Sequence, residues 1–159
     1  MRFLLTLLLL SLLIGCASNT LVNPNLQQPI DPAKAEVVGS KIVGAGGIPD
    51  QIYAGSVDGK QLRYVAVDQT LKIWPIEPGA HEFEVGYSGS TGKVFIAPFV
   101  AGGKIKADLK AGHRYIVKIR AAGDDMIVFF FKDSVDGSEA AVSQPVRLVG
   151  IPMPIFIPG

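Results

Sequence analysis

The stretch LKAGHRYIVKIRAAGDDMIVFFFKDS, residues 109–134, decides the fold class of this chain. In its first half Tyr115, Val117 and Ile119 alternate with a second set of positions, Arg114, Ile116 and Lys118. A period of two predicts a strand with one apolar face and one face in water.

The second half of the stretch contains MIVFFF, residues 126–131. This run is apolar on both faces, which predicts a strand in the centre of a sheet. Between the two runs the residues AGDD at 122–125 predict a turn. Two strands joined by a short turn form an antiparallel hairpin.

The same stretch contains a spacing that favours a β-sandwich. Leu109 is followed by Gly112 three residues on and by Tyr115 six residues on. This spacing is seen around the tyrosine corner, in which a Tyr near a strand start returns its hydroxyl to the backbone a few residues upstream. We expect a buried Tyr115 with its hydroxyl bonded to the backbone between Leu109 and Ala111.

Short β-rich runs divided by turn residues continue on both sides of this stretch. Asp58-Gly59, for example, can supply the positive φ angles of a tight hairpin. Strand signals spaced by about 8 to 15 residues are typical of a sandwich or barrel. We predict an all-β fold, a single antiparallel β-sandwich of about seven to nine strands over residues 35–159.

The first 34 residues have a different character. Residues 1–15 place one cation, Arg2, before a largely apolar run of twelve residues and a small residue, Gly15, which is the order of a secretory signal peptide. The run is shorter than the about 20 residues of a transmembrane helix. Residues 16–34 contain three prolines and predict a flexible tether, part of which can instead lie along the domain as an edge segment.

Cys16 is the single cysteine of the chain and stands directly after the signal-like segment. Leu13-Ile14-Gly15-Cys16 resembles the lipobox of bacterial lipoprotein precursors, which implies a diacylglycerol on the cysteine sulfur and cleavage before the cysteine. The next residue is Ala17, and not the Asp that commonly retains such lipoproteins in the inner membrane. The resemblance therefore implies a lipid anchor at the periplasmic face of the outer membrane. An ordinary signal peptide with an incidental cysteine is the alternative.

Composition and length limit the partners of this chain and the way its core can form. Removal of residues 1–15 leaves 144 residues with 14 basic and 14 acidic side chains, so charge gives no case for nucleic acid. This length suits one domain. Its core must form without a disulfide, because the chain has no second cysteine.

No catalytic or cofactor-binding motif is complete, so we predict a protein that is not an enzyme and that takes no cofactor. His81 and His113 each follow a turn glycine, and a zinc site built on both would need further ligands. KDSVDGSE at 132–139 gathers acidic residues without the spacing of a calcium loop. GYSGS at 86–90 lacks the second glycine of a nucleophile elbow. We expect half-exposed histidines at strand starts, no metal site and a solvated acidic turn.

The last ten residues, GIPMPIFIPG, combine five large apolar side chains with three prolines and no charge. Prolines at this spacing prevent a helix and predict an extended segment at an edge. The segment either covers the end of its own sandwich or forms an exposed contact for an envelope partner. The apolar residues of that candidate contact are Ile151, Met153, Ile155, Phe156 and Ile157.

The stretches VDGK (57–60), IEPGAHEFEV (76–85) and LKAGHRYIVKI (109–119) resemble small bacterial lipoproteins with transthyretin-like or PEGA-like sandwich domains. The resemblance implies a fold more than a function, since most such families have no assigned reaction. We expect a membrane-anchored periplasmic lipoprotein with a non-catalytic binding or scaffolding role. One alternative is an envelope or cell-wall hydrolase, which needs a polar cleft. The other is a carrier of an apolar ligand, which needs an apolar cavity.

Overall fold

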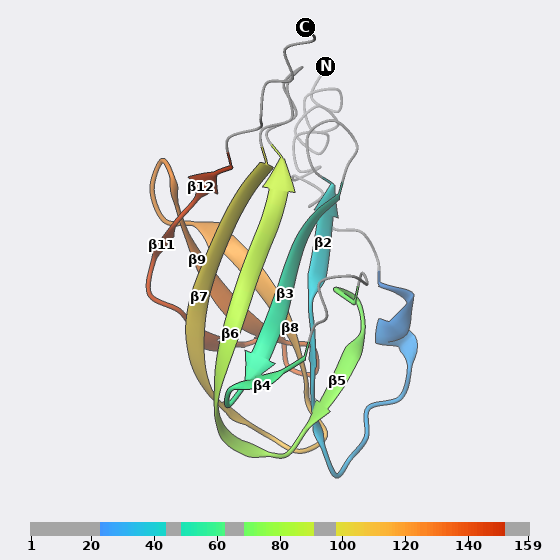
Figure 1. The fold of residues 1–159 in the computed structure, drawn as a ribbon. Helices are drawn as coiled ribbons and strands as arrows, with labels where there is room; N and C mark the ends of the chain where they lie inside the picture. The colour runs from blue at the N-terminus through green and yellow to red at the C-terminus, as the bar shows by residue number, and fades with distance from the viewer. Residues whose placement is uncertain (1–22, 44–48, 63–68, 91–97, 152–159) are drawn as a thin grey trace, which may run out of the picture.

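The computed structural model describes residues 23–43, 49–62, 69–90 and 98–151, which form two β-sheets packed face to face (Figure 1). One sheet has the order β10 (Glu139–Val142), β9 (Met126–Asp133), β8 (Arg114–Ala121), β1 (Ala35–Val38) and β5 (Ile73–Ile76), and β11 (Val146–Arg147) also pairs with β9. The other has the order β12 (Val149–Gly150), β7 (Pro98–Leu109), β6 (Gly79–Ser90), β3 (Pro49–Val57) and β2 (Ser40–Val43), with β4 (Lys60–Gln61) beside β3. A short 3-10 helix, η2 (Pro24–Gln27), precedes the strands.

The predicted all-β sandwich is confirmed. Nine of the twelve described strands contain four or more residues, which agrees with the seven to nine expected, while β4, β11 and β12 contain two each. The prediction that every pairing is antiparallel is wrong at one place, because β1 runs parallel to β8. Parallel neighbours are joined by long connections. Hairpin signals in the sequence therefore carry no information about this pair.

Both predicted hairpins are present. Asp58 and Gly59 have φ angles of 48° and 77° and connect β3 to β4. The turn at 122–125 joins β8 to β9, and the N–H of Ala122 donates to the carbonyl of Met126 across it (2.8 Å). β9 lies between β8 and β10. The doubly apolar run MIVFFF is thus an interior strand of its sheet, as predicted.

The chain passes from one sheet to the other at Gly39, between β1 and β2. A Cβ on Gly39 would lie 2.5 Å from the carbonyl oxygen of Thr70 and closer still to that of Ile52. Both neighbours are backbone atoms, which cannot rotate away as a side chain can. A residue without a Cβ is therefore required where the two strands cross over.

The core between the sheets is filled by large side chains from alternate strand positions. Phe83 of β6 meets Phe131 of β9 edge to face, with ring centroids 5.0 Å apart. Tyr115 of β8 packs against the same Phe131 ring, with centroids 6.3 Å apart. Glu36 of β1 and Arg114 of β8 alternate with core positions, so both lie on the outer face of their sheet.

Candidate functional site

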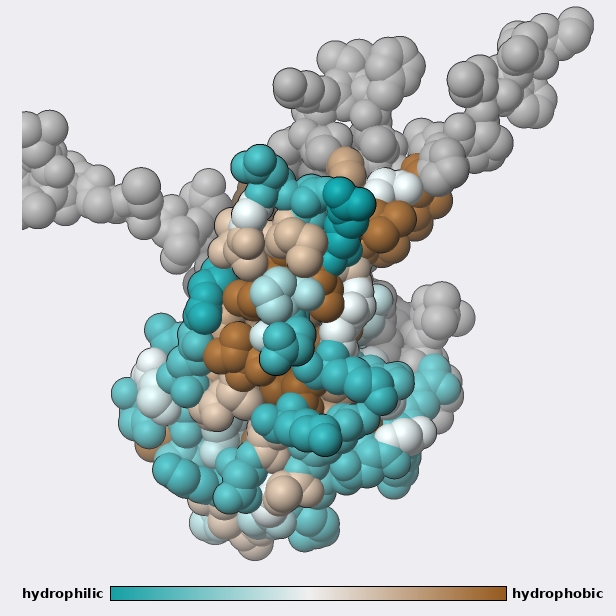
Figure 2. Space-filling model, turned by 90° about the vertical axis from the view of Figure 1, so that its left-hand side faces the viewer, coloured by the Kyte–Doolittle hydropathy of each residue, from teal (hydrophilic) through white to brown (hydrophobic). Residues whose placement is uncertain are grey.

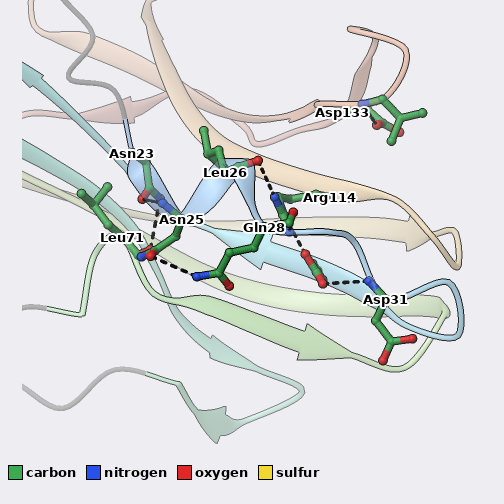
Figure 3. A network of polar contacts seen from close by, with 10 residues as sticks. Asn23, Asn25, Leu26, Gln28, Asp31, Leu71, Arg114 and Asp133 are labelled. Atoms are coloured by element: carbon green, nitrogen blue, oxygen red, sulfur yellow. Dashed lines mark hydrogen bonds and ion pairs between the residues drawn. The ribbon is translucent and has the colours of Figure 1, made fainter.

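The segment of residues 23–34, called here the N-terminal strap, is fixed on the outside of the sandwich (Figure 3). Asn23 is 3% exposed, and its amide donates to the carbonyl of Leu71 (3.1 Å). Asn25 donates to the same carbonyl (3.0 Å). The Asn23 side chain also caps η2 by accepting from the N–H of Asn25. Of the tether predicted over residues 16–34, the part from Asn23 onward is bound along the domain, which is the alternative that the sequence left open.

Arg114 in β8 holds the middle of the strap. Its side chain is 2% exposed, and its Nε donates to Oε2 of Glu36 in β1 at 2.6 Å. Its two other nitrogens donate to strap carbonyls, Nη1 to Leu26 (2.9 Å) and Nη2 to Gln28 (3.1 Å), as Figure 3 shows. The planar fork of a guanidinium satisfies several acceptors at once. A single side chain therefore joins β1, β8 and the strap.

Glu36 completes the network from the other side. It is 6% exposed, and its second oxygen, Oε1, accepts from the N–H of Asp31 in the strap (3.2 Å). Both charges of the Arg114–Glu36 pair are thus removed from water and bonded to strap backbone as well as to each other. Removing one of them would leave the other buried and unpaired, at a cost of about 3–5 kcal/mol. The arrangement can hold a chain segment in one position.

The sequence predicts that Arg114 lies on the outer face of its strand and faces water. Arg114 does lie on the outer face, but it is buried there, so the prediction of exposure is wrong. At Arg114 the strap covers the outer face of β8. The strap carbonyls accept hydrogen bonds from the guanidinium, which replace its bonds to water. The two charged partners stand 78 residues apart. The sequence contains one weak signal, since Glu36 is a lone carboxylate in the otherwise apolar run AEVV.

The tyrosine-corner prediction agrees with the structure. Tyr115 is 1% exposed. Its hydroxyl accepts a hydrogen bond from the N–H of Lys110 (3.0 Å), which lies within the predicted range from Leu109 to Ala111. Burial raises the pKa of the Tyr115 hydroxyl. Gly112 has a φ of 73°, and its N–H donates to the carbonyl of Lys34 (2.8 Å). The corner therefore also secures the end of the strap.

Each histidine forms a pair with an aspartate. His113 Nδ1 lies 2.6 Å from Asp133 Oδ2. His81 Nδ1 lies 2.6 Å from Asp58 Oδ2, and its Nε2 lies 2.8 Å from the carbonyl oxygen of Glu77. Burial by itself lowers the pKa of His81, but the bonds to Asp58 and to the Glu77 carbonyl outweigh burial and raise that pKa. In the described parts of the chain, no three His, Cys, Asp or Glu side chains are grouped to hold a metal ion.

The acidic turn KDSVDGSE does not gather its carboxylates. Asp133 is bonded to His113, and Asp136 accepts from the N–H two residues further on. Glu139 in β10 forms an ion pair with Arg120 in β8, across the intervening strand β9. The three carboxylates therefore have separate partners. Asp136 and Glu139 are exposed, but Asp133 is 2% exposed, so the prediction of a solvated acidic turn is wrong at Asp133, where the carboxylate is buried against His113.

A shallow groove of about 490 Å³ lies between the strap and the chain that leads into β5. The residues that line it are Asn25, Gln28, Lys41, Gln69, Leu71, Lys72 and Ile73. These side chains are mainly amides and ammonium groups, and none of them is a carboxylate. The Nζ of Lys72 also lies 3.9 Å from the centroid of the Trp74 ring, a cation–π contact. The groove is thus lined mainly by amide and ammonium groups, and those of Asn25, Gln28 and Lys72 already have partners within the protein.

The opposite side of the sandwich, the β10–β12 edge (residues 139–151), is more apolar. Val142, Val149 and Ile151 are 43%, 55% and 44% exposed. Figure 2 shows this side, where hydrophobic side chains run between hydrophilic ones toward the end of the described chain. Of the candidate partner contact, only Ile151 belongs to the described residues. The other predicted site residues, Cys16, Met153, Ile155, Phe156 and Ile157, lie outside them.

No family model, no curated protein and no solved structure matches this chain. Within the residues that the structure describes, no helix has the length and apolar character required to cross a membrane.

Proposed function

We propose that this chain is a lipoprotein of the bacterial cell envelope, anchored by lipid on Cys16 at the periplasmic face of the outer membrane. Its sandwich domain would have a non-catalytic binding or scaffolding role. The observation that carries the proposal is the lipobox-like Leu13-Ile14-Gly15-Cys16 directly after a signal-like apolar run. Fatty acyl chains hold a protein by additive burial of methylene groups, about 0.8 kcal/mol each, and two or more chains hold it firmly.

The attachment of the strap to the sandwich supports the proposal. The strap begins at Asn23, only seven peptide steps after Cys16, and the buried Arg114–Glu36 pair attaches it to two strands of the sandwich. A load on the lipid anchor would thus be transmitted to the folded domain. An attachment of this kind suits a protein whose task is to hold a partner near a membrane.

The apolar β10–β12 edge is our candidate for the partner contact. Val149 and Ile151 expose about half of their surface just before the apolar, proline-rich tail. Exposed apolar surface that continues into such a segment is typical of a protein–protein contact. The tail joins this contact only if it leaves its own sandwich uncovered, and the deletion described below separates the two cases.

The two alternative functions receive less support. A hydrolase could use the His113–Asp133 pair as a base and its orienting carboxylate, but the neighbouring Asp136 and Glu139 are bonded to other groups. An apolar carrier would need space between the sheets, where the rings of Phe83 and Phe131 are in contact instead.

Metabolic labelling with a fatty-acid probe tests the anchor. The wild type should become labelled and sediment with membranes, whereas Cys16→Ser should do neither. Ser11→Ala, inside the signal-like run, is the matched control and should label as the wild type does. Equal labelling of the wild type and Cys16→Ser would refute the proposal.

Deletion of residues 151–159 tests the role of the tail. If the tail covers its own sandwich, the shortened domain should lose several kcal/mol of stability, because burial of each large apolar side chain contributes roughly 1.5 kcal/mol or more, and it should bind a hydrophobic dye. If the tail contacts a partner, the melting curve should not change, and crosslinks to envelope proteins should disappear. We expect the loss of stability, and an unchanged melting curve would make the tail the leading binding site.

A further inference from the structure

We infer that the outer face of β8 and β9 binds a short acidic segment of a partner protein, whose carboxylates pair with Lys118 and Lys132. The contact surface, called here the lysine face, consists of Ile116, Lys118, Phe130, Lys132 and Val142. The inference rests on the binding or scaffolding role proposed above, and not on the lipid anchor. It goes beyond that role by naming a surface and the chemistry of its partner.

The strand register places the two lysines close together on one side of the sheet. Each lysine directly follows a residue of the hydrophobic core in its strand, so both point to the outside. Lys118 stands opposite Phe130, and Lys132 stands opposite Ile116. The two lysines are therefore diagonal neighbours, with Cα atoms about 7–8 Å apart. One carboxylate, with its two oxygens, can accept from both ammonium groups.

Neither lysine forms an ion pair or hydrogen bond with a carboxylate of the residues that the structure describes. The side chain of Lys118 is half-buried, and that of Lys132 is exposed. Burial lowers the pKa of the Lys118 ammonium, and the charge of Lys132 lowers it further. A partly buried charge without a partner costs free energy. A carboxylate between the two ammonium groups would supply the partner and offset their repulsion.

The carboxylates on the adjoining strands are bonded to other groups. Glu139 in β10 stands opposite Lys132, but its ion pair is with Arg120. Glu36 in β1 is paired with Arg114 under the strap. The lysine face therefore keeps the charge of both its lysines.

The turn at 122–125 carries two further carboxylates beyond the end of β8. Asp125 is paired with Arg147. Asp124 is exposed in the turn, which begins four residues after Lys118. Four strand residues span about 13 Å, which exceeds the Debye length of about 8–10 Å. Asp124 thus does not neutralise the lysine pair.

The apolar part of the lysine face favours a protein segment over a free anion. Ile116 and Phe130 are half-buried, and Val142 stands opposite Phe130 with 43% of its surface exposed. A segment that carries apolar side chains beside its carboxylates would cover this surface, which a phosphate ion does not. Val142 also belongs to the β10–β12 edge, so the lysine face adjoins the apolar contact proposed there.

The dimensions favour one extended segment over a second folded domain. β8 and β9 contain eight residues each, and eight strand residues span about 26 Å. With strands about 4.8 Å apart, the outer face of β8, β9 and β10 covers roughly 300–400 Å². A stable contact between folded domains needs about 800 Å² from each partner. The tail of this chain, residues 150–159, has no acidic side chain to match the lysines.

Binding of a synthetic peptide to the mature, lipidated protein in micelles of a non-ionic detergent tests the inference. The probe is a short peptide of alternating glutamate and valine, and its control has glutamine in place of each glutamate. The glutamate peptide should bind, shift the amide NMR signals of the lysine face and be released by salt. The glutamine peptide should bind at least about tenfold more weakly, because it cannot form the ion pairs.

Charge variants locate the contact. Lys118→Met with Lys132→Met keeps apolar stems and removes both ammonium groups, so it should weaken binding of the glutamate peptide by at least about tenfold. Lys60→Met with Lys110→Met removes the same charge from two exposed positions elsewhere, and it should change binding less than about twofold. Lys118→Met alone should melt at the same temperature as the wild type or higher, because its ammonium has no partner to lose.

The opposite results would overturn the inference. Equal weakening by the two double variants would mean that only net charge matters, and a lower melting temperature of Lys118→Met would mean that its ammonium is bonded within the fold. No binding of the glutamate peptide at about 1 mM would exclude the acidic partner. Sedimentation with phosphatidylglycerol vesicles that requires both lysines, without peptide binding, would assign the face to a membrane instead. Fatty-acid labelling of Cys16 is a separate measurement, so its failure refutes the anchor and not this contact.

Discussion

Two arginine–carboxylate pairs, one on each side of the sandwich, have almost the same geometry and opposite surroundings. Arg114 Nε lies 2.6 Å from Glu36 Oε2, and the side chains are 2% and 8% exposed. Arg147 Nε lies 2.7 Å from Asp125 Oδ2 near the β10–β12 edge, and the side chains are 72% and 51% exposed. Water screens the second pair, and such pairs contribute about 0–1 kcal/mol.

The difference between the pairs reflects how the two sides are closed. On the strap side the outer face of β1 and β8 is covered by chain, and the covering backbone bonds to the buried charges. On the other side the sheets end in short strands with exposed valines. The strap side is specified by a polar network that tolerates little change, whereas the β10–β12 edge has surface available for contact with another molecule. Burial, and not the distance between the charges, decides how much stability is lost when one partner of a pair is removed.

Exchanging each arginine for leucine should give the largest contrast. Arg114→Leu leaves Glu36 buried and unpaired, so it should lower the free energy of unfolding by about 3–5 kcal/mol. Arg147→Leu should change it by about 1 kcal/mol or less. Denaturant unfolding measures both. Limited proteolysis should also cut within the strap only in Arg114→Leu, and equal costs for the two variants would contradict the comparison.

Two glycines provide the next contrast. A Cβ at Gly39 would meet backbone oxygens of Thr70 and Ile52, so Gly39→Ala should cost at least about 2 kcal/mol through forced backbone shifts. A Cβ at Gly150 in β12 would meet the Phe99 ring at 3.5 Å, an ordinary contact, so Gly150→Ala should stay within about 0.5 kcal/mol. Thermal melting compares the two, and a neutral Gly39→Ala would mean that the crossover is not close-packed.

Tyr115→Phe should have a moderate effect on the strap side. The change removes the hydrogen bond from the N–H of Lys110 and keeps the ring in the core, so we expect a loss of about 1 kcal/mol in denaturant unfolding. Tyr53→Phe, at a half-buried position on the outer face of β3, is a control for the removal of a tyrosine hydroxyl elsewhere. A change within error for Tyr115→Phe would remove the tyrosine corner as a source of stability.

The His81–Asp58 pair should give the smallest effect, and one that depends on pH. Because the folded-state pKa of His81 is raised, its stabilisation is complete below the unfolded value of about 6.5 and is lost as pH rises through the folded value. The hydrogen bond from His81 and that from the N–H of Glu82 lower the pKa of Asp58. Its contribution is present above about pH 4 and is lost as pH falls through the lowered pKa.

The wild type should therefore exceed His81→Gln in stability most clearly between about pH 4 and 6.5. Melting temperatures measured across pH provide the comparison. Adding Asp58→Asn to His81→Gln should abolish the pH dependence of stability that the pair still contributes through Asp58. A difference that does not vary with pH would show that the pair is structural packing and not an ionic contact.

Much of the fold could be predicted from local patterns. The hairpin of β8 and β9, the interior position of MIVFFF and the turn at Asp58-Gly59 all follow from residues close together in sequence. Tyr115 was predictable for the same reason, because its hydrogen-bond partner is five residues away. Contacts of this range depend on periodicity and turn chemistry, and both are visible in the sequence letters.

By itself, then, the sequence determined the class of fold, the main hairpins, the tyrosine corner and the expectation of an anchor at Cys16. Only the tertiary structure decided that β1 pairs with β8 in parallel, that Gly39 is the crossover between the sheets and that Arg114 is buried. The physical reason is that burial depends on what covers a residue. The strap that covers Arg114 lies 86 and 88 residues away at its two contacts, so no local pattern could distinguish a charged side chain in water from one enclosed by distant backbone.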